Sequence, residues 1–190
     1  MKDLGNGVVK KIEIFRTYMI YQKKPCADIK LIDKLVFKPC NFSLKNIEPE
    51  TESQEYSAHC FQLDEKQNLF RVGKITPTKT GQFVTIWKRN AEGITAPFEV
   101  TDEFDFYLIA TKTATNFGVF IFPKKILHEN KILSDQTRDG KRGIRVYPIW
   151  DEATSKQAQK TQIWQTKYFL DLSNPRQIDL NRAKNLLKIE

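Results

Sequence analysis

The feature that most constrains the fold is a series of short runs rich in aromatic and β-branched residues that begins near Tyr56. Clusters of turn-forming residues, such as the one at 76–81, separate these runs. Runs of this kind, punctuated by Gly, Pro, Asn and Asp, are typical of strands joined by tight connections. The sequence therefore predicts a mainly antiparallel, meander-like sheet with strands at 56–63, 69–75, 82–89, 104–112, 117–122 and 143–149.

Helical patterns lie on both sides of this series. Residues 8–24 mix apolar side chains with lysines up to Pro25, and Pro123 suits the first turn of a short helix that follows it. The strongest helical pattern covers 151–172, and a shorter amphipathic one covers 178–189. We therefore expect an α+β fold in which helices flank a central sheet.

The chain has the size and composition of one globular domain. Its 190 residues include 40% hydrophobic and 28% charged residues, which excludes wholesale disorder. A chain of this length reaches a radius of about 16 Å and can bury a real core. We expect residues 1–190 to form a single domain. No apolar run approaches the length of about 18 residues that spans a bilayer, so we expect a cytoplasmic protein without membrane insertion.

The cysteines give no sign of a disulfide framework or a metal site. Cys26, Cys40 and Cys60 are odd in number and widely spaced, so we expect reduced thiols. His59 adjoins Cys60, but the CxxC spacing of zinc sites is missing. We expect neither a metal nor a cofactor.

Positive charge gathers in two parts of the chain that lie far apart in the sequence. The first, 70–89, holds five cations with no intervening carboxylate: Arg71, Lys74, Lys79, Lys88 and Arg89. The second, 140–150, again places cations beside aromatic rings. Because the screening length at physiological salt is about 8 Å, only charges gathered on one surface act together on a ligand. With a net charge of +8, these clusters indicate a surface that receives anions, of which phosphate is the commonest polyvalent example.

Strand periodicity predicts which side chains of the second segment face outward. Ile144 and Val146 point to one face of a strand, and Arg145 and Tyr147 point to the other. If the aliphatic pair is buried, a guanidinium lies beside a stacking ring on the accessible face, which suits a phosphate and a base. The turn at 76–81 offers hydroxyls and free amides that either hold an anion or only shape a hairpin. It lacks the spacing of a P-loop.

Two further groups of residues leave alternatives open. Amide side chains, including Gln162 and Gln165, accompany the aromatic residues of the helix predicted after 151. Buried amides need partners, which are either the loops of the sheet or the base edges of a ligand. Acidic residues that precede the strands either face the basic half of the protein or are solvated; these are Glu48, Glu50, Glu52 and Glu55.

These patterns together predict a nucleic-acid-binding protein with a basic, aromatic-lined groove. Tyr147 is expected to stack on bases, and Trp87 either does the same or belongs to the core. Gln162 and Gln165 are candidate readers of base edges. The candidate phosphate contacts are Lys74, Lys79, Lys88, Arg89, Lys141, Arg142 and Arg145.

Four blocks of the chain occur in a specific order: KITPTKTGQFVTIWKR, FGVFIFPKKIL, GKRGIRVYPIWD and QAQKTQIWQTKYF. In this combination the chain resembles the MepB family, small bacterial proteins named for an accessory member of a multidrug-efflux operon. The resemblance covers about 55–170. It implies a cytoplasmic protein with a mixed α+β fold, and it implies nucleic-acid binding with a nuclease-like architecture. It supplies no catalytic residues.

The alternatives to simple binding are a nuclease and a protein-interaction module for an acidic partner. A nuclease of the PD-(D/E)xK type needs carboxylates that hold Mg²⁺ and a nearby lysine. Asp139 and Lys141 have the required short spacing and precede a strand, and Asp105 is a candidate second carboxylate. Such spacings also arise by chance in a lysine-rich chain, and Asp105 could simply cap a strand. Mg²⁺ is expected as a cofactor only for the nuclease.

Overall fold

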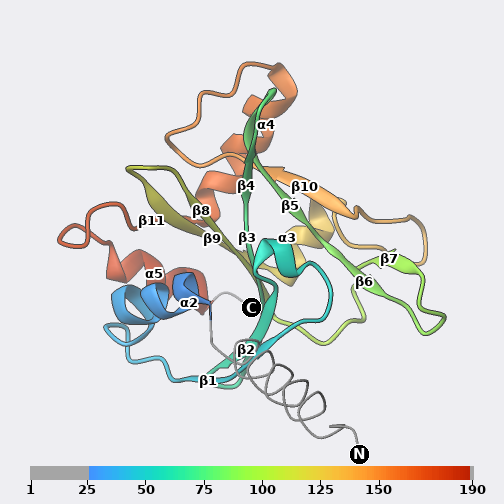
Figure 1. Ribbon diagram of the computed structural model, residues 1–190, viewed down its shortest axis with the longest axis horizontal. Coiled ribbons are helices and arrows are strands. Elements are labelled where there is room, and N and C mark those ends of the chain that lie inside the picture. The colour runs from blue at the N-terminus through green and yellow to red at the C-terminus, as the bar shows by residue number, and fades with distance from the viewer. Residues whose placement is uncertain (1–25, 189–190) are drawn as a thin grey trace, which may run out of the picture.

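A six-stranded sheet of order β1-β2-β3-β8-β9-β11 forms the centre of the computed structural model, which describes residues 26–188 (Figure 1). The helix predicted at 8–24 lies outside the described residues. All neighbouring strands are antiparallel except β3 and β8, which are parallel. The strands are β1 (Leu44–Pro49), β2 (His59–Leu63), β3 (Lys66–Val72), β8 (Phe106–Lys112), β9 (Phe117–Pro123) and β11 (Phe169–Asp171).

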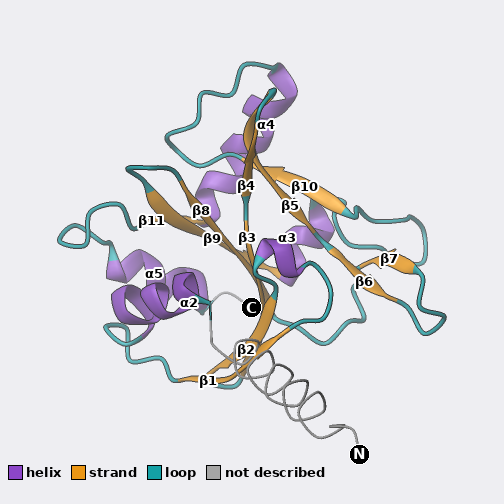
Figure 2. Ribbon diagram, viewed as in Figure 1, coloured by secondary structure: helices purple, strands orange, loops and turns teal. Residues whose placement is uncertain are grey.

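A second, three-stranded antiparallel sheet of order β10-β5-β4 packs against the first (Figure 2). It consists of β4 (Lys74–Thr76), β5 (Lys79–Thr85) and β10 (Gly143–Val146). A hairpin of β6 (Trp87–Arg89) and β7 (Thr95–Pro97) continues from β5. The Tyr107 hydroxyl of β8 donates to the Thr85 carbonyl of β5 at 3.1 Å, which fixes the small sheet against the large one.

The helices cover the sheets and connect them. Helix α2 (Ala27–Ile32) runs into a π-helical turn at Asp33–Phe37, and a 3₁₀ turn covers Gln54–Tyr56. Helices α3 (Lys124–Glu129) and α5 (Leu180–Leu187) follow β9 and β11. Helix α4 (Lys156–Gln165), with a 3₁₀ turn at Thr166–Tyr168, stands beside the tip of the β4-β5 hairpin (Figure 1).

The core lies on both faces of the large sheet. Helices α2 and α5 pack on one face, against alternate residues of β8 such as Phe106 and Leu108. The small sheet and α3 cover the other face, which carries Tyr107 and Ile109. Strand β8 is therefore buried from Phe106 to Thr111. A strand buried on both faces has a nearly continuous apolar sequence rather than an alternating one.

The structure confirms the α+β class and a mainly antiparallel sheet, and it corrects two details. The sheet is not a simple meander, because β3 and β8 pair in parallel and strands β4 to β7 lie between them in the chain. The helix predicted over 151–172 is shorter, since Phe169 and Leu170 are buried as strand β11 at the edge of β9. Burial of these two side chains against the sheet outweighs their helical pattern. Among the described residues, no helix is long and apolar enough to cross a membrane.

Candidate nucleic-acid interface

Strand pairing brings the two basic segments of the sequence together. Strand β10, from the second segment, pairs with β5, from the first, so that Arg145 lies opposite Phe83. On the other side of β5, Phe83 lies opposite Lys74 of β4. The three strands therefore carry a row in which an aromatic ring lies between two cations.

The alternation predicted for these strands is confirmed. Ile144 and Val146 of β10 are buried in the core, together with Val84 of β5. Arg145 and Tyr147 remain partly exposed on the opposite face. The small sheet therefore turns its apolar side to the large sheet and its cations and rings to solvent.

Three rings on this side each lie within cation–π distance of a cation. Lys74 Nζ is 4.4 Å from the centre of the Tyr56 ring, Arg145 Cζ is 5.9 Å from Phe83, and Arg89 Cζ is 5.6 Å from Trp87. All three rings are half-buried. Trp87 is thus not a core residue. We call this surface the basic–aromatic face, and its members are Tyr56, Lys74, Phe83, Trp87, Arg89 and Arg145.

Two glycines allow rings to lie close to the sheet. A Cβ atom at Gly143 would lie 2.6 Å from the Phe83 ring, and one at Gly81 would lie 2.6 Å from the Tyr147 ring. Gly81 also has a φ of +84°, which residues with a side chain rarely adopt. Both glycines therefore give space to aromatic side chains on the neighbouring strand.

A groove of about 400 Å³ adjoins the basic–aromatic face, between the free edge of β10 and helix α4. Lys79, Lys141, Arg145 and Tyr147 line it, and α4 contributes polar side chains such as Thr161. Helix α4 begins here because the Ser155 hydroxyl accepts a hydrogen bond from the Ala158 N–H. Gln165 also lines the groove, which thus collects five of the side chains predicted from the sequence to contact nucleic acid.

Four of the predicted cations keep their charge free for a ligand. Lys74, Lys79, Lys141 and Arg145 form no ion pair with the carboxylates of residues 26–188. Arg145 is held instead by uncharged acceptors: the Gly81 carbonyl at 3.0 Å and the Thr76 hydroxyl at 2.7 Å. These contacts orient the guanidinium and leave its positive charge unneutralised.

The other cations of the two segments are neutralised within the protein. Lys88 pairs with Asp102, and Arg89 Nε lies 2.7 Å from Glu52. Arg142 lies 3.1 Å from Asp139 and thereby lowers the pKa of that carboxyl. Lys88, Arg89 and Arg142 therefore share their charge with a carboxylate, unlike the four free cations, and Arg89 also belongs to the basic–aromatic face.

Arg71 belongs to the first basic segment but does not lie on the surface. Its side chain is 0% exposed and forms a two-point ion pair with Glu50, at 2.8 and 2.7 Å. Glu52 likewise pairs with Arg89. Two residues of the acidic stretch thus face basic partners, which was one of the two alternatives that the sequence left open.

The amides of α4 hold the protein together rather than reading bases. Gln165 is buried, accepts from the Tyr147 N–H at 2.9 Å and donates to the Arg145 carbonyl at 2.9 Å. It therefore binds the free edge of β10 as the peptide group of another strand would. Gln162 donates to the carbonyls of Pro148 and Asp151. These hydrogen bonds match the first of the two alternatives that the sequence left open, in which parts of the protein are the partners of the amides.

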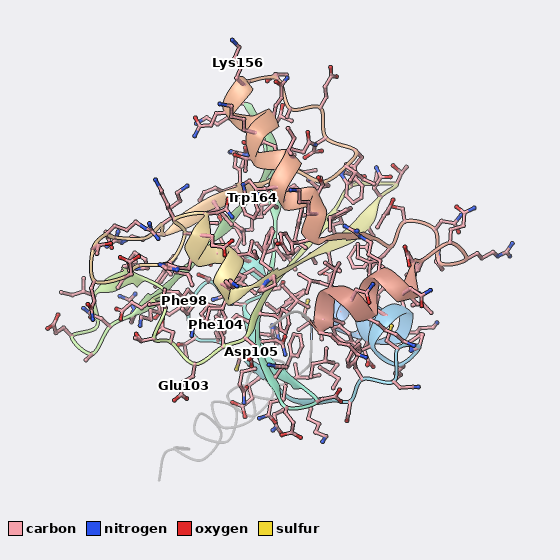
Figure 3. All side chains as sticks on the ribbon, turned by 180° about the vertical axis from the view of Figure 1, so that it is seen from behind. Phe98, Glu103, Phe104, Asp105, Lys156 and Trp164 are labelled. Atoms are coloured by element: carbon pink, nitrogen blue, oxygen red, sulfur yellow. The ribbon has the colours of Figure 1, made fainter. Side chains whose placement is uncertain are left out.

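The candidate nuclease residues lie in different surroundings. Asp105 accepts from the Gln67 N–H at 2.8 Å and pairs with Lys66 at 3.3 Å. Asp105 lies well away from Trp164 of α4 (Figure 3), and Trp164 lines the groove that also contains Lys141. Asp139 belongs to the loop before β10, with Lys141 in the neighbouring groove. Within residues 26–188, no three His, Cys, Asp or Glu side chains are grouped so that they could hold a metal ion.

One carboxyl near the groove has an unusual environment. Burial raises the pKa of Asp151 above its ordinary value of 3.8, although the Gly81 N–H lowers it in part. Asp151 follows Trp150 in the loop between β10 and α4. Gly81 lies against the Tyr147 ring, and Tyr147 lines the groove. The Asp151 carboxyl, which is near Gly81, is therefore a negative group beside a cationic site.

Sequence reasoning missed Tyr56 and Phe83 as members of the interface. Alternation along β5 does place Phe83 on the same side as Trp87. Tyr56 was less accessible to prediction, because it comes from a 3₁₀ turn before β2 and meets Phe83 only through the tertiary fold, with ring centres 6.1 Å apart.

The family is decided by a match to the MepB-like family model over residues 50–171. This range covers more than half of the chain and includes all of the basic–aromatic face. The chain belongs to the MepB-like family. It is also similar to a protein solved as "Crystal Structure of MepB", with a TM-score of 0.67 and 30% sequence identity over 86% of this chain and 98% of that one. A search of curated proteins finds no match.

Proposed function

We propose that this MepB-like protein binds nucleic acid through the basic–aromatic face and the adjoining groove. The observation that carries the proposal is the pairing of β5 with β10, which sets free cations and half-exposed rings side by side. Phosphate groups would contact the cations, and bases would contact the rings.

The charge of the surface suits a polyanion better than a small anion. Lys74, Lys79, Lys141 and Arg145 come from three strands and a loop, so their positive charges are spread over the face and the groove. A polymer of phosphates contacts several such charges at once and gains affinity from the release of its counterions. The net charge of +8 adds a longer-range attraction.

The proposal is tested by fluorescence anisotropy with a labelled oligonucleotide. We expect the double variant Lys79→Gln/Lys141→Gln to bind more weakly than the wild type, because both lysines line the groove and have no carboxylate partner among the described residues. The matched control is Lys34→Gln/Lys45→Gln, which removes the same charge from exposed positions near α2 and on β1.

If the two double variants weaken binding equally, net charge alone explains the attraction and the groove is not the site. If the wild type binds no oligonucleotide but does bind an acidic protein, the surface is a protein-interaction module instead.

A further inference from the structure

The basic–aromatic face presents rings as well as charges, and this combination distinguishes between forms of nucleic acid. We infer that the face selects single-stranded nucleic acid over duplex, with Tyr56, Phe83 and Trp87 as the residues that stack on bases. The inference rests on the proposed function, since it names the substrate class of the same surface.

A duplex gives a protein no access to the flat faces of its bases. In a duplex the flat faces of the bases are stacked on one another, so a protein meets only phosphates, sugars and base edges. A ring on the protein surface can stack only on a base that is unpaired or splayed out. Half-exposed rings therefore add nothing to the binding of an intact duplex, but they add affinity for a single strand.

The rings are held in place before a ligand arrives. Phe83 lies over Gly143 and meets the Tyr56 ring nearly edge-on, with an interplanar angle of 68°. Trp87 is fixed in the β6-β7 hairpin, opposite Pro97. Rings that are already ordered lose little conformational entropy on binding, which favours their use as stacking surfaces.

A cation accompanies each ring. The distances from cation to ring centre are 4.4 Å for Lys74 and Tyr56, 5.9 Å for Arg145 and Phe83, and 5.6 Å for Arg89 and Trp87, and each cation lies over one face of its ring. In a single strand the phosphate adjoins the base that stacks, so Tyr56 with Lys74 and Phe83 with Arg145 can each receive one nucleotide. Arg89 is paired with Glu52, so Trp87 contributes its ring alone. A flexible strand combines a charged backbone with exposed base faces, which suits both kinds of group.

The groove beside β10 is consistent with a single strand. Its volume of about 400 Å³ lies in the range of small-molecule sites and suits one nucleotide unit. Arg145 belongs to both the face and the groove, so a strand that stacks on Phe83 can continue past Arg145 toward Lys141.

The test compares single-stranded DNA and single-stranded RNA with duplex DNA of the same sequence, by anisotropy at one fixed salt concentration. We expect at least one single strand to bind more tightly than the duplex. Phe83→Leu, which keeps an apolar side chain over Gly143, should weaken single-strand binding at least about 5-fold and change duplex binding less than about 2-fold. Tyr56→Leu, on a surface turn, should act in the same direction.

Phe42→Leu is the control. Phe42 is also partly buried, but it packs against the core on the face of the large sheet that α2 and α5 cover. A thermal melt of each variant shows that it folds. If the duplex binds at least as tightly as both single strands, the inference is overturned and the proposed function stands. An equal loss for both forms in Phe83→Leu and Tyr56→Leu has the same meaning. Failure of the wild type to bind any of the polymers would overturn both.

Discussion

Replacement of Glu50 by Gln tests whether the ion pair with Arg71 is a buried structural element. The Arg71 side chain is 0% exposed and that of Glu50 is 21% exposed, so the pair lies in the core at its arginine end and near solvent at its carboxylate end. Arg71 also contacts the Tyr107 ring, and its Nε has no hydrogen-bond partner. The carboxylate of Glu50 is therefore the group that compensates a buried charge.

The expected loss follows from this burial. Removing one partner of a buried ion pair costs about 3–5 kcal/mol, because the remaining charge stays uncompensated. The partial exposure of Glu50 favours the lower end, about 3 kcal/mol. With a urea m-value of about 2 kcal/mol/M, Glu50→Gln should lower the midpoint of urea unfolding by about 1.5 M.

Urea unfolding followed by circular dichroism measures this shift. Glu48→Gln is the control, since Glu48 lies on the same strand but is exposed and forms no ion pair within the described residues. A surface ion pair contributes only about 0–1 kcal/mol. A shift below about 0.5 M for Glu50→Gln, or a shift equal to that of Glu48→Gln, would refute the view that Arg71 is a core residue with a single charged partner.

Three further variants test other parts of the structure. Gln165→Ala should lower the free energy of unfolding by about 1–3 kcal/mol, because the Tyr147 N–H and Arg145 carbonyl lose their partner; an unchanged unfolding midpoint would contradict this role. Gly81→Ala should destabilise the protein by about 1–3 kcal/mol, since φ is +84° and a Cβ would meet the Tyr147 ring; a variant with the unfolding midpoint of the wild type would contradict it. Asp151→Asn should stabilise the protein at pH 7. Burial raises the pKa of Asp151 above 3.8, so the folded state takes up its proton more readily than the unfolded state, and stability falls as the pH rises through the folded pKa. Thermal melts from pH 7 down through the folded pKa should show that the stability gain of Asp151→Asn over wild type shrinks as the pH is lowered. A gain that grows in acid would contradict this prediction.

Periodicity in the sequence predicted the strands of the interface well. Ile144 and Val146 alternate with Arg145 and Tyr147, and the core accepts only the aliphatic pair. Alternation succeeds because the burial of alternate side chains is decided locally along a strand. The central strands β8 and β9 have a different signal, a nearly continuous apolar run, because they are buried on both faces.

The sequence did not predict which cations would remain free. Arg71 and Lys74 lie three residues apart in one basic segment, yet the first is in the core with Glu50 and the second is exposed beside Tyr56. Their partners come from the segment before β2, so the difference depends on tertiary contacts. For the same reason, the pattern of α4 predicted that its buried amides need partners but did not identify the edge of β10 as the partner of Gln165.

The slope of binding affinity against salt concentration tests the central claim most directly. Lys74 of the basic–aromatic face and Lys79 and Lys141 of the groove have no carboxylate partner among residues 26–188. For a single strand, each phosphate neutralised contributes about 0.7 to the slope of log K against log salt. The account predicts a steep slope for the wild type, and a slope smaller by about 2 for the variant Lys74→Gln/Lys79→Gln/Lys141→Gln. A flat wild-type slope, or an unchanged slope in the triple variant, would contradict it.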